Sequence, residues 1–106
     1  MSGDRTVVDD PAGQRFELRV DGAVAGFAAY RAGEGVVTLT HTEVDPAYEG
    51  QGLGSVLVRG ALDQLRGRGV AVRPSCPFVR SWVERHPDYL DLVPAADRER
   101  YGLPGA

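Results

Sequence analysis

The chain has 106 residues, enough for one small domain with a single hydrophobic core. Hydrophobic residues make up 42% of it and charged residues 25%, which are ordinary proportions for a globular protein and exclude the disordered and fibrous classes. The net charge is −3 and the basic residues are scattered along the chain, which argues against nucleic acid as a partner.

The sequence also indicates where such a protein works. Its apolar runs are too short to span a bilayer, and its first residues lack the pattern of a signal peptide. The single cysteine, Cys76, excludes an internal disulfide and is typical of a reducing compartment. We therefore expect a cytoplasmic protein with no membrane partner.

The first part of the chain predicts an antiparallel meander of strands. Residues 6–9 form a short candidate strand, and residues 15–20 alternate between apolar and charged side chains, as a half-buried strand does. Asp21-Gly22 is a strong hairpin signal, because a type I′ turn needs a positive φ at both central positions. Residues 23–31 are then expected to be the antiparallel partner.

The longest strand candidate covers residues 36–44, whose β-branched side chains suit a pleated surface. Strict alternation predicts Leu39, His41 and Glu43 on one face of this strand, and the threonines with Val44 on the other. Pro46 ends the strand.

The second part of the chain changes to a helical period over residues 52–68. A short strand at 70–73 and a short helix at 78–85 follow, and residues 89–93 are expected to be extended. Residues 94–106 carry little pattern and predict a surface tail. The order of elements predicts one domain over residues 1–106 with an α/β fold of the α+β type, in which a mixed, mostly antiparallel sheet packs against two main helices.

A glycine-rich loop joins the long strand to the first helix. Gly50, Gly52 and Gly54 allow successive N–H groups to turn to one side, and the following helix adds its free N-terminal donors, a combination that binds phosphate groups. Ser55 stands where a dinucleotide fingerprint needs glycine, and the Gly-Lys-Ser/Thr ending of a P-loop is absent. The loop therefore indicates another phosphate ligand, although such a cluster is also common as a plain tight turn.

Several short motifs accompany this loop. They are His41-Thr42-Glu43-Val44, then Glu49-Gly50-Gln51-Gly52-Leu53-Gly54, then Cys76-Pro77-Phe78 with Trp82 and His86-Pro87-Asp88-Tyr89. Together they resemble the small, single-domain branch of the GCN5-related N-acetyltransferases. The glycine motif is common to that superfamily, whereas the cysteine and His-Pro motifs point to the minimal branch. The resemblance covers about half of the chain.

The resemblance implies an acyl-CoA N-acyltransferase-like fold, acetyl-CoA as cosubstrate, no metal, and a small-molecule or peptide amine as acceptor. It implies that the CoA pyrophosphate lies on the backbone of the loop, and that the pantetheine arm runs along the end of the long strand as an added strand would. The residues implied in binding are Val44, Gly50, Gln51, Gly52, Leu53, Gly54 and Ser55.

The chain departs from the family at two places. The family usually has Gln or Arg where Glu49 stands, and a carboxylate beside a pyrophosphate is unfavourable unless it points away. Larger members have helices near the position of Asp21-Gly22, which here joins two strands directly. The acceptor side is therefore expected to be open, and the sequence does not identify the acceptor.

Four residues are candidates for the chemistry, which needs a neutral amine and a protonated leaving thiolate. Glu43 and His41 lie on the same predicted strand face next to the expected thioester, so either can take a proton, although each is also explained as a structural polar residue. Cys76 begins a helix and could lie beside the CoA thiol or accept the acyl group, or be a small buried residue. Tyr89 could protonate the thiolate or be a core aromatic.

Two functions remain open at this point. The first is an acetyl-CoA-dependent N-acetyltransferase in which the amine attacks the thioester directly. The second is a module of the same fold that binds CoA or acetyl-CoA with weak or no catalysis. The sequence does not predict the oligomeric state.

Overall fold

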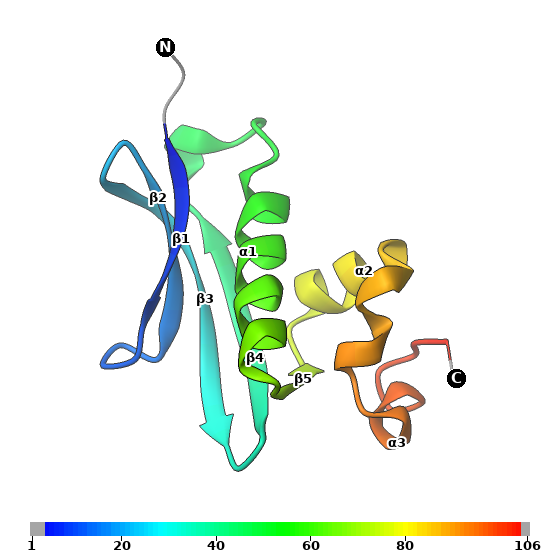
Figure 1. Ribbon diagram of the computed structural model, residues 1–106. Helices are drawn as coiled ribbons and strands as arrows, with labels where there is room; N and C mark the ends of the chain where they lie inside the picture. Colours follow the sequence, from blue (N-terminus) through cyan, green and yellow to red (C-terminus); the bar gives the residue numbers. More distant parts are fainter. Residues whose placement is uncertain (1–3, 105–106) are drawn as a thin grey trace.

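The computed structural model describes residues 4–104, which form one mixed sheet with helices packed against it (Figure 1). The strands are β1 (Arg5–Asp10), β2 (Arg15–Val20), β3 (Ala23–Gly33), β4 (Val36–Val44) and β5 (Ala71–Pro74). The helices are α1 (Leu53–Arg68), α2 (Pro77–Arg85) and α3 (Ala95–Arg98), with 3₁₀ turns η1 (Pro46–Tyr48) and η2 (Pro87–Leu92). No helix in residues 4–104 is long and apolar enough to cross a membrane.

The strands lie in chain order across the sheet. β1 to β4 pair antiparallel, and β4 pairs parallel with β5 through the crossover helix α1. Asp21 and Gly22, between β2 and β3, have φ values of 52° and 85°, as the expected hairpin turn requires. The predicted fold class, a mostly antiparallel sheet with two main helices, is confirmed.

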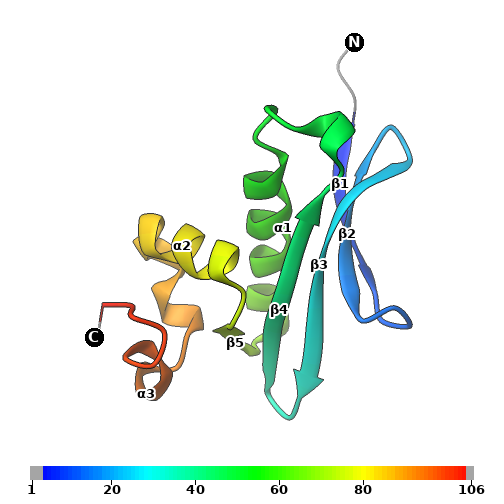
Figure 2. The same ribbon diagram turned by 180° about the vertical axis from the view of Figure 1, so that it is seen from behind.

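The core lies between the sheet and α1. The buried face of α1 consists of Leu53, Leu57, Val58, Ala61, Leu62 and Leu65, and it packs against apolar side chains that include Phe16 and Leu18 of β2 and Leu39 of β4. Figure 2 shows the opposite face of β3 and β4, which no helix covers in the part of the chain that the structure describes. The two faces of the sheet therefore have different environments.

A bulge in β4 changes the expected alternation of its side chains. Ala29 of β3 pairs with His41 and Tyr30 pairs with Leu39, so Thr40 is an extra residue in the ladder. Leu39 is buried, His41 and Glu43 are exposed, and Thr42 and Val44 are half-buried beside α1. The prediction that Leu39, His41 and Glu43 share a face is wrong, because the extra residue shifts the alternation by one position.

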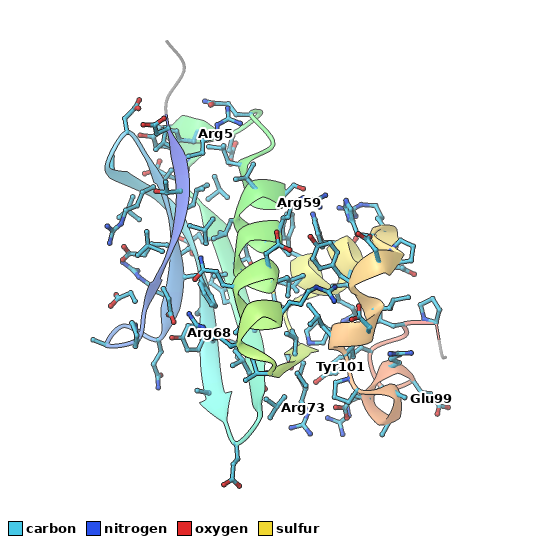
Figure 3. All side chains as sticks on the ribbon, in the orientation of Figure 1. Arg5, Arg59, Arg68, Arg73, Glu99 and Tyr101 are labelled. Atoms are coloured by element: carbon cyan, nitrogen blue, oxygen red, sulfur yellow. The ribbon has the colours of Figure 1, made fainter. Side chains whose placement is uncertain are left out.

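The C-terminal segment also differs from its prediction. Residues 87–92 form η2 instead of an extended piece. The expected surface tail is wrong at Asp97, Tyr101 and Leu103, which are buried, whereas the other residues of 94–104 are exposed or half-buried; residues 105–106 lie outside the described residues. Nε of Arg73 donates to Asp97 at 2.9 Å, and Figure 3 shows Arg73 and Tyr101 where β5 meets this segment. The C-terminal segment thus packs against the end of β5 and is bonded to it.

Gly60 and Gly67 of α1 provide a matched test of the close approach between α1 and β1. A Cβ at Gly60 would lie 2.5 Å from Cγ2 of Val7, whereas one at Gly67 would meet nothing within 4 Å. We expect Gly60→Ala to lower the free energy of unfolding by about 1–3 kcal/mol through overpacking. We expect Gly67→Ala to raise it by about 0.5–1 kcal/mol, because alanine has the higher helix propensity. Urea unfolding followed by circular dichroism measures both, and equal effects would show that β1 does not pack tightly on α1.

Candidate functional site

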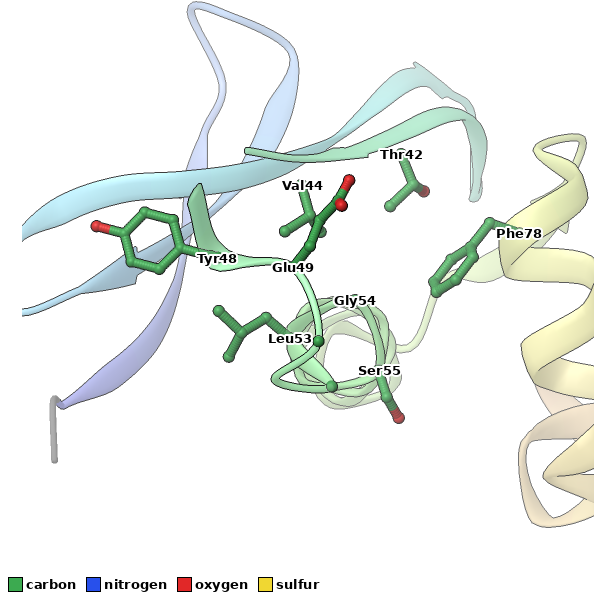
Figure 4. Close-up of a pocket in the computed structure, with 10 residues that line it drawn as sticks. Thr42, Val44, Tyr48, Glu49, Leu53, Gly54, Ser55 and Phe78 are labelled. Carbon is green, nitrogen blue, oxygen red and sulfur yellow. The ribbon is translucent and has the colours of Figure 1, made fainter. Parts of the chain in front are cut away.

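A cavity of about 430 Å³ opens where β4 and β5 separate (Figure 4). The two strands pair only from Val36 and Ala71 to Leu39 and Pro74, after which the chain turns into α2. The cavity lies between the C-terminal half of β4, the glycine-rich loop and the start of α2. Its lining consists of Thr42, Val44, Tyr48, Glu49, Gly50, Gly52, Leu53, Gly54, Ser55 and Phe78.

One wall of the cavity is a free strand edge. The N–H of Cys76 donates to the carbonyl of Leu39 at 2.9 Å, beyond the last residue of β5. The N–H of Asp45 donates to Ala25 of β3 at 2.7 Å. Because backbone groups alternate in direction along a strand, those of Thr42 and Val44 point away from β3, toward the cavity. An extended ligand with amide groups can pair with this edge as an added strand would.

The loop and the helix that follows form the anion-binding end of the cavity. Gly50 and Gly52 have φ values of 84° and 71°, which residues with a side chain rarely adopt. Gly52 is the N-cap of α1, and within residues 4–104 no side chain caps this helix. The first N–H groups of α1 are therefore without helical partners, and its first turn holds no acidic residue. Free donors and the helix dipole together favour a phosphate ligand here.

Phe78 forms the aromatic wall of the cavity. Phe78 is 42% exposed although it lies in the first turn of α2, a helix that packs on the core, and a Cβ at Gly54 would lie 2.7 Å from its Cζ. Gly54 thus allows the ring to lie against the start of α1. Phe78 belongs to the Cys76-Pro77-Phe78 motif, but neither it nor Thr42 nor Tyr48 was predicted from the sequence to line the site. The alternating pattern places Thr42 on the same face as Val44, but it does not show that this face lines a cavity.

Most of the residues expected to bind the cofactor line the cavity, but not all of them do so with their side chains. Val44, Gly50, Gly52, Leu53, Gly54 and Ser55 line it, and Gln51 does not. The side chain of Leu53 is buried in the core, and the hydroxyl of Ser55 accepts a bond of 2.7 Å from Nε1 of buried Trp82. Figure 4 shows the Ser55 side chain turned away from the cavity. Leu53 and Ser55 therefore present backbone groups.

Cys76 lies behind Thr42. Its side chain is buried, with 3% of the residue exposed, and its Sγ donates to Oγ1 of Thr42 at 3.4 Å. Because Thr42 lines the cavity and Cys76 does not, the thiol is separated from the cavity by the side chain of Thr42.

His41 and Glu43 lie together on the uncovered face of the sheet. Nε2 of His41 and Oε1 of Glu43 are 3.0 Å apart, and their side chains are 59% and 63% exposed. Glu43 borders a second hollow, which Phe27 and Asp45 also line. The structure thus brings the two expected bases together, but on the face of β4 opposite Thr42 and Val44.

Tyr89 lies away from the cavity, against α1. Its hydroxyl donates to Oδ1 of Asp63 at 2.7 Å and lies 3.3 Å from Nη1 of Arg59. Burial and the bond to Asp63 raise the pKa of Tyr89, which makes it a weaker acid. Its ring packs edge-on against Trp82, with centroids 5.0 Å apart. The geometry therefore favours the core-aromatic interpretation over a proton donor at the cavity.

Comparisons with known proteins identify a family and several proteins to which this chain is similar. The model of a family described as GCN5-related N-acetyl-transferase matches residues 15–92. The [ribosomal protein bS18]-alanine N-acetyltransferase of Escherichia coli K12 is 41% identical over 56 residues, which are 53% of this chain and 38% of that protein. The match thus spans well under half the length of that relative.

Other relatives match over more of their length. Protein NATD1 of Mus musculus is 29% identical over 97 residues, covering 88% of each chain. A solved structure of a Staphylococcus aureus protein described as GCN5-like superposes with a TM-score of 0.64 at 20% identity, covering 83% of this chain and 86% of the other. This last similarity concerns the fold.

The bond between Ser55 and Trp82 can be tested against a second serine. Ser55→Ala leaves the buried indole N–H without its acceptor, so we expect a loss of about 1–3 kcal/mol in the free energy of unfolding. Ser81→Ala is the control, because half-buried Ser81 accepts its bond from the exposed Arg85; a change within about 0.5 kcal/mol is expected. Urea unfolding followed by the fluorescence of Trp82, the one tryptophan in the sequence, measures both. Similar losses in the two variants would contradict a structural role for the Ser55 hydroxyl.

Proposed function

Because the chain belongs to the GCN5-related N-acetyltransferase family, we propose that it transfers the acetyl group of acetyl-CoA to an amine by direct attack of the amine on the thioester. The observation that carries the proposal is the cavity, which joins a free strand edge to the donor-rich start of α1. Acetyl-CoA supplies the acetyl group as an activated thioester.

The residues present fit this cosubstrate. The free N–H groups of the loop and of the first turn of α1 suit a diphosphate, since they offer donors and a positive dipole end. The backbone groups of Thr42 and Val44 on the free edge of β4 suit an amide-containing arm. Phe78 offers an apolar wall to the same arm. We propose that these residues hold acetyl-CoA.

We propose His41 as the base that takes the proton of the acceptor amine, with Glu43 orienting its ring. Histidine is the side chain that most often serves as a general base near neutral pH. The Nε2–Oε1 contact of 3.0 Å fixes the imidazole, and its exposure leaves it accessible to an amine. The acceptor then approaches from the uncovered face and meets the thioester at the free edge of β4. Tyr89 has no part in this scheme, because its hydroxyl is bonded to Asp63.

The acceptor is a small-molecule or peptide amine. The Escherichia coli relative is named as an alanine N-acetyltransferase of ribosomal protein bS18, which makes a peptide with N-terminal alanine one acceptor to test. The second candidate function, a CoA-binding module with weak or no catalysis, is favoured by one observation. The His41–Glu43 pair is more than half exposed, and besides its contact with Glu43 the His41 ring packs tilted against Phe27, with centroids 6.0 Å apart. The cytoplasm remains the compartment that we propose.

Binding and turnover together test the function. We expect calorimetry to detect CoA and acetyl-CoA binding, and we expect thiol release with at least one amine among peptides, polyamines and amino acids. His41→Asn should lower kcat about 100-fold without changing CoA affinity. Glu34→Gln, in the exposed turn between β3 and β4, is the control. Binding without turnover for any amine would favour the CoA-binding module, and no binding at millimolar concentration would refute both functions.

Glu49 is the carboxylate among the cavity-lining residues, and it borders the proposed diphosphate site (Figure 4). Removing a negative charge beside the diphosphate site favours an anionic ligand, so Glu49→Gln should lower the Kd for CoA about threefold at low salt. The effect should shrink at high salt because the side chain is exposed. Glu34→Gln, at the far end of the sheet, should leave the Kd unchanged. A higher Kd in Glu49→Gln would instead show that the carboxylate accepts a hydrogen bond from the ligand.

A further inference from the structure

The side chain of Thr42 lies between the cavity and the buried thiol of Cys76. The bulge at Thr40 turns Thr42 to the side of β4 that faces α1, where it lines the cavity. Figure 4 shows Thr42 and Phe78 at one end of the cavity and Tyr48 at the other. The glycine-rich loop lies between these ends, so Thr42 borders the part of the cavity where the free edge of β4 begins.

Other hydroxyls near the cavity are committed elsewhere. Ser55 accepts its bond from Trp82, and its side chain points away. The ring of Tyr48 also points away from the cavity in Figure 4. Tyr89 donates to Asp63 and does not line the cavity. Among these groups, Thr42 is the one whose side chain lines the cavity, with its hydroxyl oxygen on the Phe78 side.

The contact with Cys76 leaves the hydroxyl proton of Thr42 free. Since Sγ of Cys76 donates to Oγ1 of Thr42, the threonine oxygen acts as acceptor in this bond. Its own proton can then point into the cavity, because a hydroxyl is both donor and acceptor. The thiol is held in place by the backbone, where the N–H of Cys76 donates to Leu39.

We propose that Thr42 donates its hydroxyl proton to the departing sulfur of CoA and recovers a proton from the thiol of Cys76. The inference rests on the proposed function. As the amine nitrogen bonds to the carbonyl carbon, the C–S bond breaks and its electron pair stays on sulfur. Oγ1 of Thr42 gives its proton to that sulfur and takes one from Sγ of Cys76. The proton lost by the amine passes to His41 and then to solvent, and water entering the emptied cavity reprotonates Cys76.

This relay explains how a threonine can serve as a proton donor at all. A threonine hydroxyl alone is too weak an acid to protonate a thiolate. With Cys76 behind it, the net exchange is from one thiol to another, so no negative charge remains on the threonine oxygen at the end of the step. The buried position of Cys76 also protects the donor from competing reactions in solvent.

The test combines kinetics with a readout that needs no turnover. Thr42→Val keeps the shape of the side chain and removes the hydroxyl, so kcat should fall at least about tenfold while the Kd for CoA stays the same. Thr42→Ser should restore most of the lost kcat. Cys76→Ala should lower kcat as much as Thr42→Val, and the double variant should be no worse than either single one, because the two residues act as a unit.

Alkylation of Cys76 by iodoacetamide gives the second readout in the ligand-free protein, where it is the one cysteine of the sequence. A hydroxyl that donates to the thiolate favours the reactive form, so Thr42→Val should slow alkylation about threefold or more and Thr42→Ser should not. Circular dichroism and urea unfolding check that the variants remain folded.

The outcomes separate the relay from the function on which it rests. A wild-type kcat in Thr42→Val, or full activity in Cys76→Ala, would overturn the relay while leaving the acetyltransferase in place. Unchanged alkylation in Thr42→Val would overturn the coupling between the two side chains. Absence of CoA binding by the unaltered protein would instead refute the proposed function.

Discussion

The bulge at Thr40 is the constraint on which the candidate site depends. A strand without an extra residue would keep Leu39, His41 and Glu43 on one face, so the polar pair would lie under α1. With Thr40 added, Leu39 is followed on the α1 side by Thr42 and Val44, and the His41–Glu43 pair turns to solvent. The hydroxyl of Thr40 donates to the carbonyl of Ala29 at 3.3 Å and so supports the irregular register.

The separation of β4 from β5 creates the cavity that Thr42 and Val44 line. β5 ends at Pro74, which has no N–H to extend the ladder, and Pro77 begins α2 shortly afterwards. Trp82 then anchors α2 to the start of α1 through its bond to Ser55, which keeps Phe78 facing the glycine-rich loop. The cavity is therefore a consequence of how one short strand ends and how the next helix is attached.

The sequence predicts those features that depend on local chemistry. The hairpin at Asp21-Gly22 and the glycine-rich loop follow from backbone preferences that neighbouring residues cannot alter. The bulge could not be predicted, because Thr40 resembles the residues around it and its position depends on the register with β3. The two interpretations of Tyr89 could not be separated for a similar reason, because its hydroxyl bonds to Asp63, far away in sequence. The contact between Tyr101 and Ser75 is likewise distant in sequence.

The two faces of β4 divide the proposed chemistry into steps with opposite requirements. A base must pass its proton to water after each turnover, and an exposed pair such as His41 and Glu43 can do so directly. A group that protonates a leaving thiolate benefits from a dry setting, because electrostatic interactions and hydrogen bonds are stronger where water is excluded. Thr42 and buried Cys76 provide that setting on the other face. A single strand with one extra residue can place both environments within a few residues of each other, because adjacent side chains on a strand point to opposite sides.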